Sequence, residues 1–373
     1  MSLVFVEGNE AVAMGAVHAG CRFFASYPIT PASSLLDAML KALPPLGGTV
    51  LQGEDEIASI GYCLGASMAG LKAMTATSGP GLSLYSENIS FAIAGEIPVV
   101  IVNVMRQGPS TGSATQGADG DVQFLRWGCS GGLPVVVLAP VDVEDCFTLT
   151  VHAFNVAERL RCPVFLASNK EIAMTRETLD MAMLERPPVV DRTYHATGSF
   201  LPFSAPPGED VPPFLPIGGA IPVRQTSSTH GPDGYITTDP AEIQAEVERL
   251  QRKVETGLPT FTFFDLDPAP GARTLVVTYG VTARAARAAL VMLRQEHGMP
   301  VSLLVLKTLW PVPEQVLRDA AHGTERVLMV EMNLGQYVHE VRRVLCLQQV
   351  DFYGTMSGQL ISPGEIAREV LRA

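Results

Sequence analysis

The sequence has few charged residues, and the charges it has are mostly negative. Charged residues make up 17% of its 373 residues, hydrophobic residues make up 47%, and the formal net charge is −12. The apolar content is enough for a large core, and the shortage of polar surface predicts that another chain covers part of the outside. The negative charge argues against nucleic acid or an anionic membrane as a partner.

Clustered cysteines and long apolar runs are also missing. None of the six cysteines forms a C-x-x-C pair, so we expect neither a zinc site nor an iron–sulfur cluster on this chain. A chain of this length without a secretion signal is not expected to be a disulfide scaffold. No uncharged apolar run reaches the roughly 20 residues that a membrane span needs. We therefore expect a cytoplasmic protein with free cysteines.

Short β-branched runs alternate with alanine-rich helical patterns along most of the chain. The runs are hydrophobic throughout, as in parallel strands covered on both faces, and their alternation with helices predicts an α/β fold. The predicted strands are Pro98–Val104, Pro134–Leu138, Pro163–Ala167, Thr274–Thr278, Val301–Leu306 and Val327–Val330. The predicted helices are Glu10–Ala19, Pro31–Ala42, Asp55–Ala69, Leu82–Ala94, Val143–Glu158, Thr282–Glu296 and Gln336–Leu345.

The alternation fails between residues 187 and 240, which are rich in proline and glycine. This stretch is too long for a simple loop. It is either an extended excursion that wraps over a neighbouring chain or a mobile insertion. A charged helical segment at 240–257 and a linker near 265–271 follow. We therefore expect a first domain over residues 1–265 and a second over residues 272–373.

The most informative stretch opens with Glu54, Asp55 and Glu56 and continues in small, nearly uncharged residues. A helix that begins with a glutamate and continues in glycine and alanine can approach a flat ring closely. Acidic residues in a first helical turn are also favoured by the helix dipole alone. Helix capping explains Glu54 and Asp55 better than it explains Glu56.

Three further motifs carry candidate site residues. Residues 77–81 (TSGPG) open a helix, where glycines allow close approach and the helix N-terminus attracts negative groups. Arg106 ends an apolar strand, where α/β folds place ligands, and arginine is suited to clamp a carboxylate. Ser110 and Thr111 add hydroxyls in the same loop. Each motif is also compatible with a purely structural role, as a turn or as a surface residue.

The fourth motif, residues 27–31 (YPITP), follows a short apolar run. Pro31 suits the first turn of a helix, and Thr30 suits its N-cap. A cap at the carboxyl end of a strand can still present its hydroxyl to a ligand.

Taken in order, the YPITP, Glu56, TSGPG and RxGPSTG motifs resemble those of the alpha subunit of 2-oxoacid:ferredoxin oxidoreductases. The resemblance covers nearly the whole chain and is greatest to the 2-oxoglutarate branch of the family. This sequence differs from the family pattern at Gln107 and over residues 112–115. The region from Thr274 onward resembles a transketolase C-terminal domain. The resemblance therefore implies a thiamine-diphosphate pyrimidine-binding domain followed by that second α/β domain.

The resemblance also implies roles for particular residues. Glu56 would activate N1′ of the aminopyrimidine of thiamine diphosphate. Thr30 and Arg106 would orient the substrate, and Ser110 and Thr111 would contact its distal end. The residues that would frame the cofactor rings are Tyr27, Pro28, Ile29, Gly79 and Pro80. The implied reaction converts 2-oxoglutarate, coenzyme A and oxidised ferredoxin to succinyl-CoA, CO2 and reduced ferredoxin, and the reverse direction fixes CO2.

Two parts of such an enzyme are missing from this sequence. Residues 117–121 (GADGD) are the nearest approach to the Gly-Asp-Gly motif that holds Mg²⁺ and the diphosphate, but no matching asparagine follows. The cysteines cannot hold a [4Fe-4S] cluster. The resemblance places both on a beta subunit, which implies half a site on this chain and an alpha2beta2 assembly. Three alternatives stay open: another 2-oxoacid as substrate, a non-redox two-subunit thiamine decarboxylase, and a non-catalytic scaffolding subunit.

Overall fold

The structure is a computed structural model that describes residues 2–372. Its strands form a seven-stranded sheet, a five-stranded sheet and a two-stranded sheet. The first sheet has the order β12 (Thr308–Trp310), β6 (Val136–Leu138), β7 (Pro163–Asn169), β5 (Val99–Met105), β4 (Ala73–Thr77), β2 (Phe23–Ser26), β3 (Thr49–Gln52). The second has the order β14 (Gln349–Gly354), β13 (Arg326–Glu331), β10 (Thr274–Tyr279), β11 (Val301–Leu306), β9 (Phe264–Asp267). The small sheet pairs β1 (Leu3–Glu7) with β8 (Arg176–Asp180).

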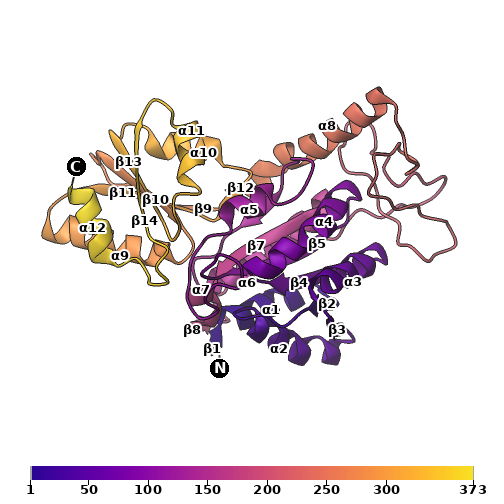
Figure 1. Cartoon of the computed structure of the whole chain (residues 1–373), viewed down its shortest axis with the longest axis horizontal. Coiled ribbons are helices and arrows are strands. Elements are labelled where there is room, and N and C mark those ends of the chain that lie inside the picture. The colour runs from indigo at the N-terminus through magenta and orange to yellow at the C-terminus, as the bar shows by residue number, and fades with distance from the viewer. Residues whose placement is uncertain (1, 373) are drawn as a thin grey trace.

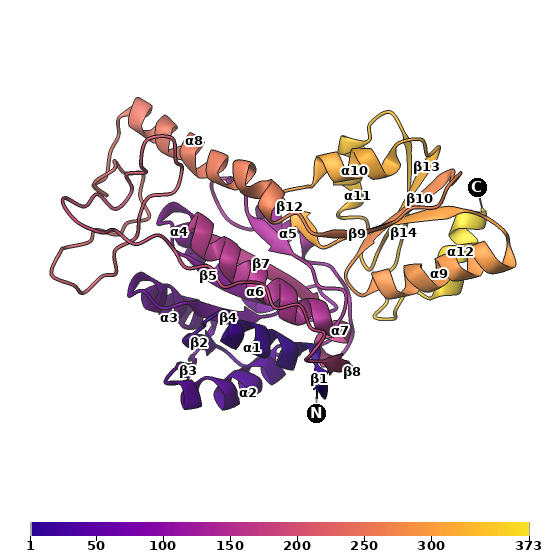
Figure 2. The same ribbon diagram turned by 180° about the vertical axis from the view of Figure 1, so that it is seen from behind.

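Helices cover both faces of the seven-stranded sheet, as predicted for buried parallel strands (Figures 1 and 2). The helices α1 (Gly8–His18), α2 (Ser33–Ala42) and α6 (Val143–Leu160) pack together on one face. The helices α3 (Glu56–Met68) and α4 (Gly79–Ala94) pack together on the other. Two separate apolar clusters result, one for each set of helices.

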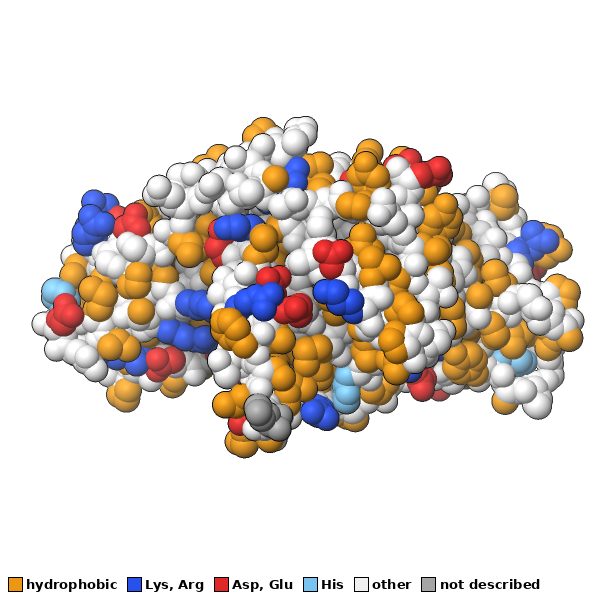
Figure 3. Space-filling model, turned by 90° about the horizontal axis from the view of Figure 1, so that it is seen from below, with side chains coloured by type: hydrophobic (Ala, Val, Ile, Leu, Met, Phe, Trp, Pro, Cys, Tyr) orange, Lys and Arg blue, Asp and Glu red, His pale blue; other side chains and the backbone are white. Residues whose placement is uncertain are grey.

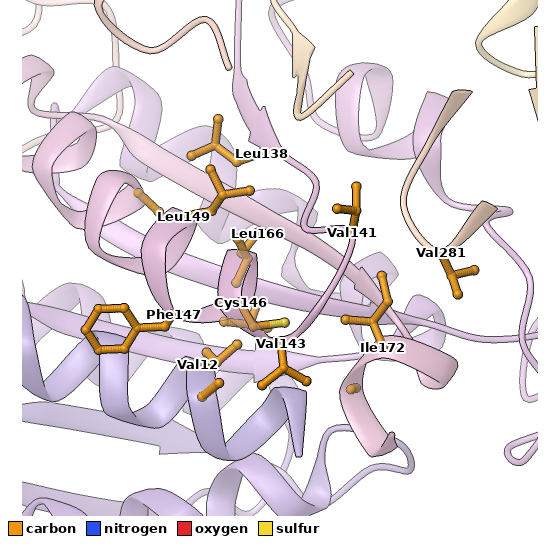
Figure 4. Close-up of a cluster of buried hydrophobic side chains, with 14 of the residues drawn as sticks. Val12, Leu138, Val141, Val143, Cys146, Phe147, Leu149, Leu166, Ile172 and Val281 are labelled. Atoms are coloured by element: carbon orange, nitrogen blue, oxygen red, sulfur yellow. The ribbon is translucent and has the colours of Figure 1, made fainter. Parts of the chain in front are cut away.

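The remaining helices are shorter or lie around the second sheet. They are η1 (Pro44–Leu46), α5 (Val122–Trp127), α7 (Lys170–Met174), α8 (Pro240–Gly257), η2 (Leu258–Thr260), α9 (Thr282–Glu296), α10 (Glu314–Ala321), α11 (Val338–Val344) and α12 (Pro363–Leu371). Both apolar clusters extend from the first sheet to the second. Figure 4 shows Val281, which precedes α9, in the same cluster as Val141 and Ile172 of the first sheet's side.

All six predicted strands pair parallel with a neighbour, as expected, and the antiparallel strands at the sheet edges were not among them. Strand β12 pairs antiparallel with β6, and β9 pairs antiparallel with β11. Strand β9 overlaps the predicted linker and joins the second sheet. Strand β12 follows the linker in the sequence but joins the first sheet. The division into two domains at residues 265 and 272 stays a prediction.

Four predicted helix starts differ from the structure by two or three residues, those of α1, α2, α4 and α11, and the differences at α2 and α4 bear on the site. Helix α2 begins at Ser33 with Ala32 as its N-cap, so Thr30 is not the cap. The carbonyl oxygens of Thr30 and Pro31 accept hydrogen bonds from the side chains of Arg106 and Asn9. They therefore do not accept the backbone hydrogen bonds of a first helical turn. Helix α4 begins at Gly79 and includes the glycine-rich motif, because Ser78 is its N-cap and Pro80 fits its first turn.

The proline-rich stretch has neither helix nor strand between β8 and α8. It extends from the body of the chain beside α8 (Figure 1). Buried arginines attach it to the first domain's helices: Arg192 donates to both carboxylate oxygens of Glu158 at 2.6 Å, and Arg161 donates to the carbonyls of Pro212 and Pro213 at 3.1 and 3.2 Å. The stretch is therefore anchored to its own chain, and its contact with a neighbour stays a prediction.

Candidate active site

Four parallel strands bring the predicted motifs to one edge of the seven-stranded sheet. The YPITP motif follows β2, the acidic cluster follows β3, the TSGPG motif begins at the last residue of β4, and Arg106 follows β5. These strands are neighbours and run in the same direction. Their carboxyl ends therefore meet at one edge, which is where open α/β sheets bind ligands.

Glu56 is the first residue of α3, and its side chain is packed against the first turn of α4. Asp55 is the N-cap and accepts a hydrogen bond from the backbone N–H of Ala58 at 2.7 Å. A Cβ atom on Gly81 would lie 2.6 Å from Cγ and 2.9 Å from Oε1 of Glu56. Only glycine at position 81 leaves room for this carboxylate. Glu54 is exposed, which confirms that Glu54 and Asp55 are the surface and capping residues of the cluster.

The carboxylate of Glu56 has no hydrogen-bond donor of its own. Its residue is only 8% exposed, yet within residues 2–372 no group donates a hydrogen bond to it. Its oxygens are not among the fully buried polar atoms without a partner, so they stay open to a ligand that supplies a donor. The site therefore fits a ring that needs a carboxylate beside a nitrogen, such as an aminopyrimidine.

Arg106 links two of the motifs through main-chain carbonyls. Its Nη1 donates to the carbonyl oxygen of Thr30 at 2.5 Å, and its Nη2 donates to that of Thr111 at 2.7 Å. Its Nε is buried and has no partner. Burial lowers the pKa of the guanidinium, and the charge of Asp121 opposes that shift. Two of the five N–H donors of the guanidinium thus fix it in place.

A pocket of about 620 Å³ lies beside this guanidinium. Of the predicted site residues, Gly79, Pro80, Arg106 and Ser110 line it. Thr30 and Thr111 do not line the pocket, but their carbonyl oxygens bind Arg106, which does. The predicted residues outside the lining are Tyr27, Pro28, Ile29, Thr30, Glu56 and Thr111. Glu56 lies against Gly81, two residues from the lining residue Gly79, so the carboxylate and the pocket adjoin.

Sequence reasoning missed several residues of the pocket. Asp121 accepts a hydrogen bond at 3.0 Å from Nδ2 of Asn103, and burial raises the pKa of Asp121. The signal for Asn103 was present, since it is a polar residue inside the apolar run of β5. Leu334 and Met356 come from the second sheet's side of the molecule, and nothing in the sequence linked them to residues so distant.

The GADGD segment lies between the two sheets and is held there by hydrogen bonds. Asp119 is buried, its Oδ1 accepts from Asn169 at 3.0 Å, and its backbone N–H donates to the carbonyl of Met332 at 2.8 Å. Burial and the neighbouring carboxylates raise the pKa of Asp119 to about 7. Across residues 2–372 no group of three or more His, Cys, Asp or Glu could hold a metal ion. All six cysteines are free, as predicted.

Two protein-family models match the chain in succession. Residues 14–249 match the thiamine-diphosphate-binding domain of pyruvate flavodoxin/ferredoxin oxidoreductases. Residues 272–366 match core domain II of pyruvate:ferredoxin oxidoreductase. The chain belongs to the 2-oxoacid:ferredoxin oxidoreductase family.

Curated relatives of this family member match over almost their full length. The chain is 38% identical over 373 residues to 2-oxoglutarate synthase subunit KorA of Methanothermobacter thermautotrophicus, which covers 99% of this chain and 98% of the relative. It is 39% identical over 359 residues to the same subunit of Archaeoglobus fulgidus, covering 95% and 96%. These matches confirm the family resemblance found in the motifs.

The fold of this family member is also found in solved structures. It matches 2-oxoglutarate:ferredoxin oxidoreductase from Magnetococcus marinus, solved with 2-oxoglutarate, coenzyme A and succinyl-CoA bound, with a TM-score of 0.95 and 31% identity. The match covers all of this chain and 65% of the other. A split-gene transketolase matches with a TM-score of 0.57 and 13% identity, which shows a shared fold. No helix within residues 2–372 is long and apolar enough to cross a membrane.

Proposed function

We propose that this chain is the alpha subunit of a 2-oxoglutarate:ferredoxin oxidoreductase. The enzyme interconverts 2-oxoglutarate, coenzyme A and oxidised ferredoxin with succinyl-CoA, CO2 and reduced ferredoxin. Full-length relatives named as 2-oxoglutarate synthase subunits support the substrate. The observation that carries the proposal is the pairing, at one sheet edge, of a buried carboxylate without a donor and a pocket with a fixed arginine.

The cofactor in this proposal is thiamine diphosphate, which when bound supplies the carbon nucleophile for the 2-oxo group. Glu56 holds the aminopyrimidine by accepting a hydrogen bond at its ring nitrogen. Its position against Gly81 fixes the carboxylate without help from another protein donor. The residues that frame the two rings are Tyr27, Pro28, Ile29, Gly79 and Pro80.

Arg106 and the loop after it hold the substrate. Arg106 lines the pocket, and its Nη N–H groups that do not donate to main-chain carbonyls are suited to a carboxylate oxygen. Thr30 lies against the same guanidinium. Ser110 and Thr111, both exposed on this chain, contact the distal carboxylate once the site is complete. A site built to satisfy a distal charged group rejects acids that lack it, because its donors are then left unpaired.

The remaining parts of the enzyme lie on other chains in this proposal. A beta subunit carries Mg²⁺, the diphosphate contacts and a [4Fe-4S] cluster, and the assembly is a cytoplasmic alpha2beta2 complex that reduces ferredoxin. The lack of a metal-binding cluster in residues 2–372 is consistent with this division. The face seen in Figure 3 has many hydrophobic side chains among its charged ones, which suits a chain partly covered by a partner.

A branched-chain 2-oxoacid is the second candidate substrate. The chain is 31% identical over 374 residues to ketoisovalerate oxidoreductase subunit VorB of Methanothermobacter thermautotrophicus. Gln107, which differs from the family pattern, lines the pocket and has a buried Oε1 without a partner. That oxygen accepts only and cannot bond to a carboxylate, but a polar side chain in the lining is still less favourable for a branched alkyl group.

The test is to measure kcat/KM for 2-oxoglutarate, pyruvate and 2-oxoisovalerate on the intact complex. We expect the value for 2-oxoglutarate to exceed both others by at least about 100-fold. Comparable values would refute the selectivity, and a preference for another acid would assign the chain to a different branch of the family.

A further inference from the structure

We propose that Leu334 determines which 2-oxoacids the pocket accepts, an inference that rests on the proposed function. Leu334 follows β13 on the second sheet's side of the molecule and lines the same pocket as Arg106 and Ser110. Its side chain is 79% exposed. A large apolar side chain held this open at the edge of a ligand pocket faces whatever enters it.

The backbone around Leu334 is fixed by a buried asparagine. Asn333 is fully buried. Its Oδ1 accepts hydrogen bonds from the backbone N–H groups of Gly335 at 2.8 Å and Gln336 at 3.0 Å. Gly335 has φ of 91°, a value that favours glycine. These contacts close a tight turn with Leu334 at its apex, so the leucine is presented by a rigid loop.

The turn is also tied to the opposite wall of the pocket. Nε2 of Gln336 donates to the carbonyl oxygen of Gly120 at 2.6 Å, and Gly120 lines the pocket. Gln123 donates to the Oε1 and carbonyl oxygens of Gln336 at 3.0 and 2.7 Å. Nδ2 of Asn333 donates to the carbonyl oxygen of Asp119 at 3.0 Å. Leu334 therefore keeps a set position relative to the wall that Gly120 forms.

This position makes the second domain part of the substrate pocket. With one substrate carboxylate at Arg106, the rest of the acid extends along the pocket, which Leu334 and Met356 border with apolar, uncharged groups. Asp121 also lines the pocket, but it accepts a hydrogen bond from Asn103 and lies near Arg106. Leu334 and Met356 themselves carry no charge that would repel a second carboxylate. A negative charge at position 334 would repel such a dianion more than a monoanionic acid.

The experiment compares Leu334→Glu with Leu334→Gln in the intact complex. The two variants have nearly the same shape and differ in charge, and a residue this exposed is not needed for folding. KM is measured for 2-oxoglutarate and for 2-oxoisovalerate at low ionic strength. We expect Leu334→Glu, relative to Leu334→Gln, to raise the ratio of the two KM values by roughly threefold to tenfold, with less effect at high salt.

Leu347→Glu is the matched control, because Leu347 is 97% exposed on the same half of the chain and does not line the pocket. An equal change of both KM values, or the same ratio shift in Leu347→Glu, would overturn the proposal. Dissociation of the complex by Leu334→Glu on gel filtration would also overturn it, because Leu334 would then be an assembly contact. A wild-type preference for 2-oxoisovalerate would refute the proposed substrate and leave the ratio test valid.

Discussion

At the scale of single residues, the site depends on glycines as much as on the groups that do chemistry. A methyl group on Gly81 would lie 2.1 Å from Oγ1 of Thr77 and 2.6 Å from Cγ of Glu56. The glutamate can therefore occupy its buried position only because two helix starts meet without a side chain between them. This packing places the side chain of Glu56 in the site. The side chains of the neighbouring acids Glu54 and Asp55 are not placed there.

We predict that Glu56→Gln lowers turnover by at least about 100-fold, because the amide replaces a positioned proton partner with a group of nearly the same shape. Turnover of 2-oxoglutarate by the assembled complex is the measurement. Assembly and iron content should stay unchanged. Glu54→Gln is the control, since Glu54 is exposed. If Glu54→Gln is damaging and Glu56→Gln is mild, the assignment of the carboxylate is wrong.

We predict that Arg106→Lys lowers kcat/KM for 2-oxoglutarate by at least roughly 10-fold. A lysine has a single ammonium group, which cannot reach both the Thr30 and the Thr111 carbonyls and still face the pocket. Steady-state kinetics of the complex test this. Arg126→Lys is the control, because Arg126 also donates to backbone carbonyls but lies outside this pocket. Equal effects of the two changes would count against a substrate contact.

At the scale of elements, the position of Arg106 was predictable because it follows β5, the one strand of the four at this edge that was predicted from a strong apolar signal. Strands β5, β7, β10, β11 and β13 and the start of α8 lie close to their predicted positions. Strand β4, with two threonines and two alanines, has too little apolar character to be recognised alone. The turn around Leu334 could not be found, since it enters the pocket through contacts with residues more than 200 positions earlier.

Helix α8 is attached to the turn after α4 by a buried charge cluster. Glu96 is fully buried and pairs with Arg249 and Lys253, both at 2.7 Å. Burial raises the pKa of Glu96, but the charges of Lys253 and Arg249 outweigh it and lower the pKa to about 2. The cluster connects the turn after α4 to the helix that follows the proline-rich stretch. Removing the carboxylate would leave buried cations without their partner.

We predict that Glu96→Gln destabilises the fold by about 3–5 kcal/mol at pH 7, as expected when one member of a buried ion pair is lost. Because the folded pKa lies below the unfolded value of about 4.3, the contribution of Glu96 is complete above that pH. It is lost as the pH falls toward 2. Urea unfolding of the wild type and the variant at several pH values measures this. Glu248→Gln, an exposed change on the same helix, should have little effect.

At the scale of the whole molecule, the chain supplies some of the groups that the proposed reaction needs, and the proposal assigns the others to a beta subunit. The carboxylate, the arginine and the pocket lie at an edge of the first sheet, and the second sheet supplies Leu334 and Met356 to the same pocket. Ser110 and Thr111 are exposed although they follow a fully buried strand. Candidate substrate contacts that are open to solvent are typical of a site completed by another chain.

We predict that the isolated chain is inactive and binds thiamine diphosphate weakly, even with Mg²⁺. Most of the charge of the cofactor is on the diphosphate, and residues 2–372 contain no cluster of acids, histidines or cysteines that could hold the metal ion beside it. In the proposed site Glu56 is the only residue of this chain that hydrogen-bonds to the ring, and one hydrogen bond contributes only about 1 kcal/mol. Calorimetric titration of the isolated chain with thiamine diphosphate, with and without Mg²⁺, is the measurement, and the complex with its beta subunit is the control. Tight, Mg²⁺-dependent binding by the isolated chain would show that the metal and diphosphate site lies on this chain after all.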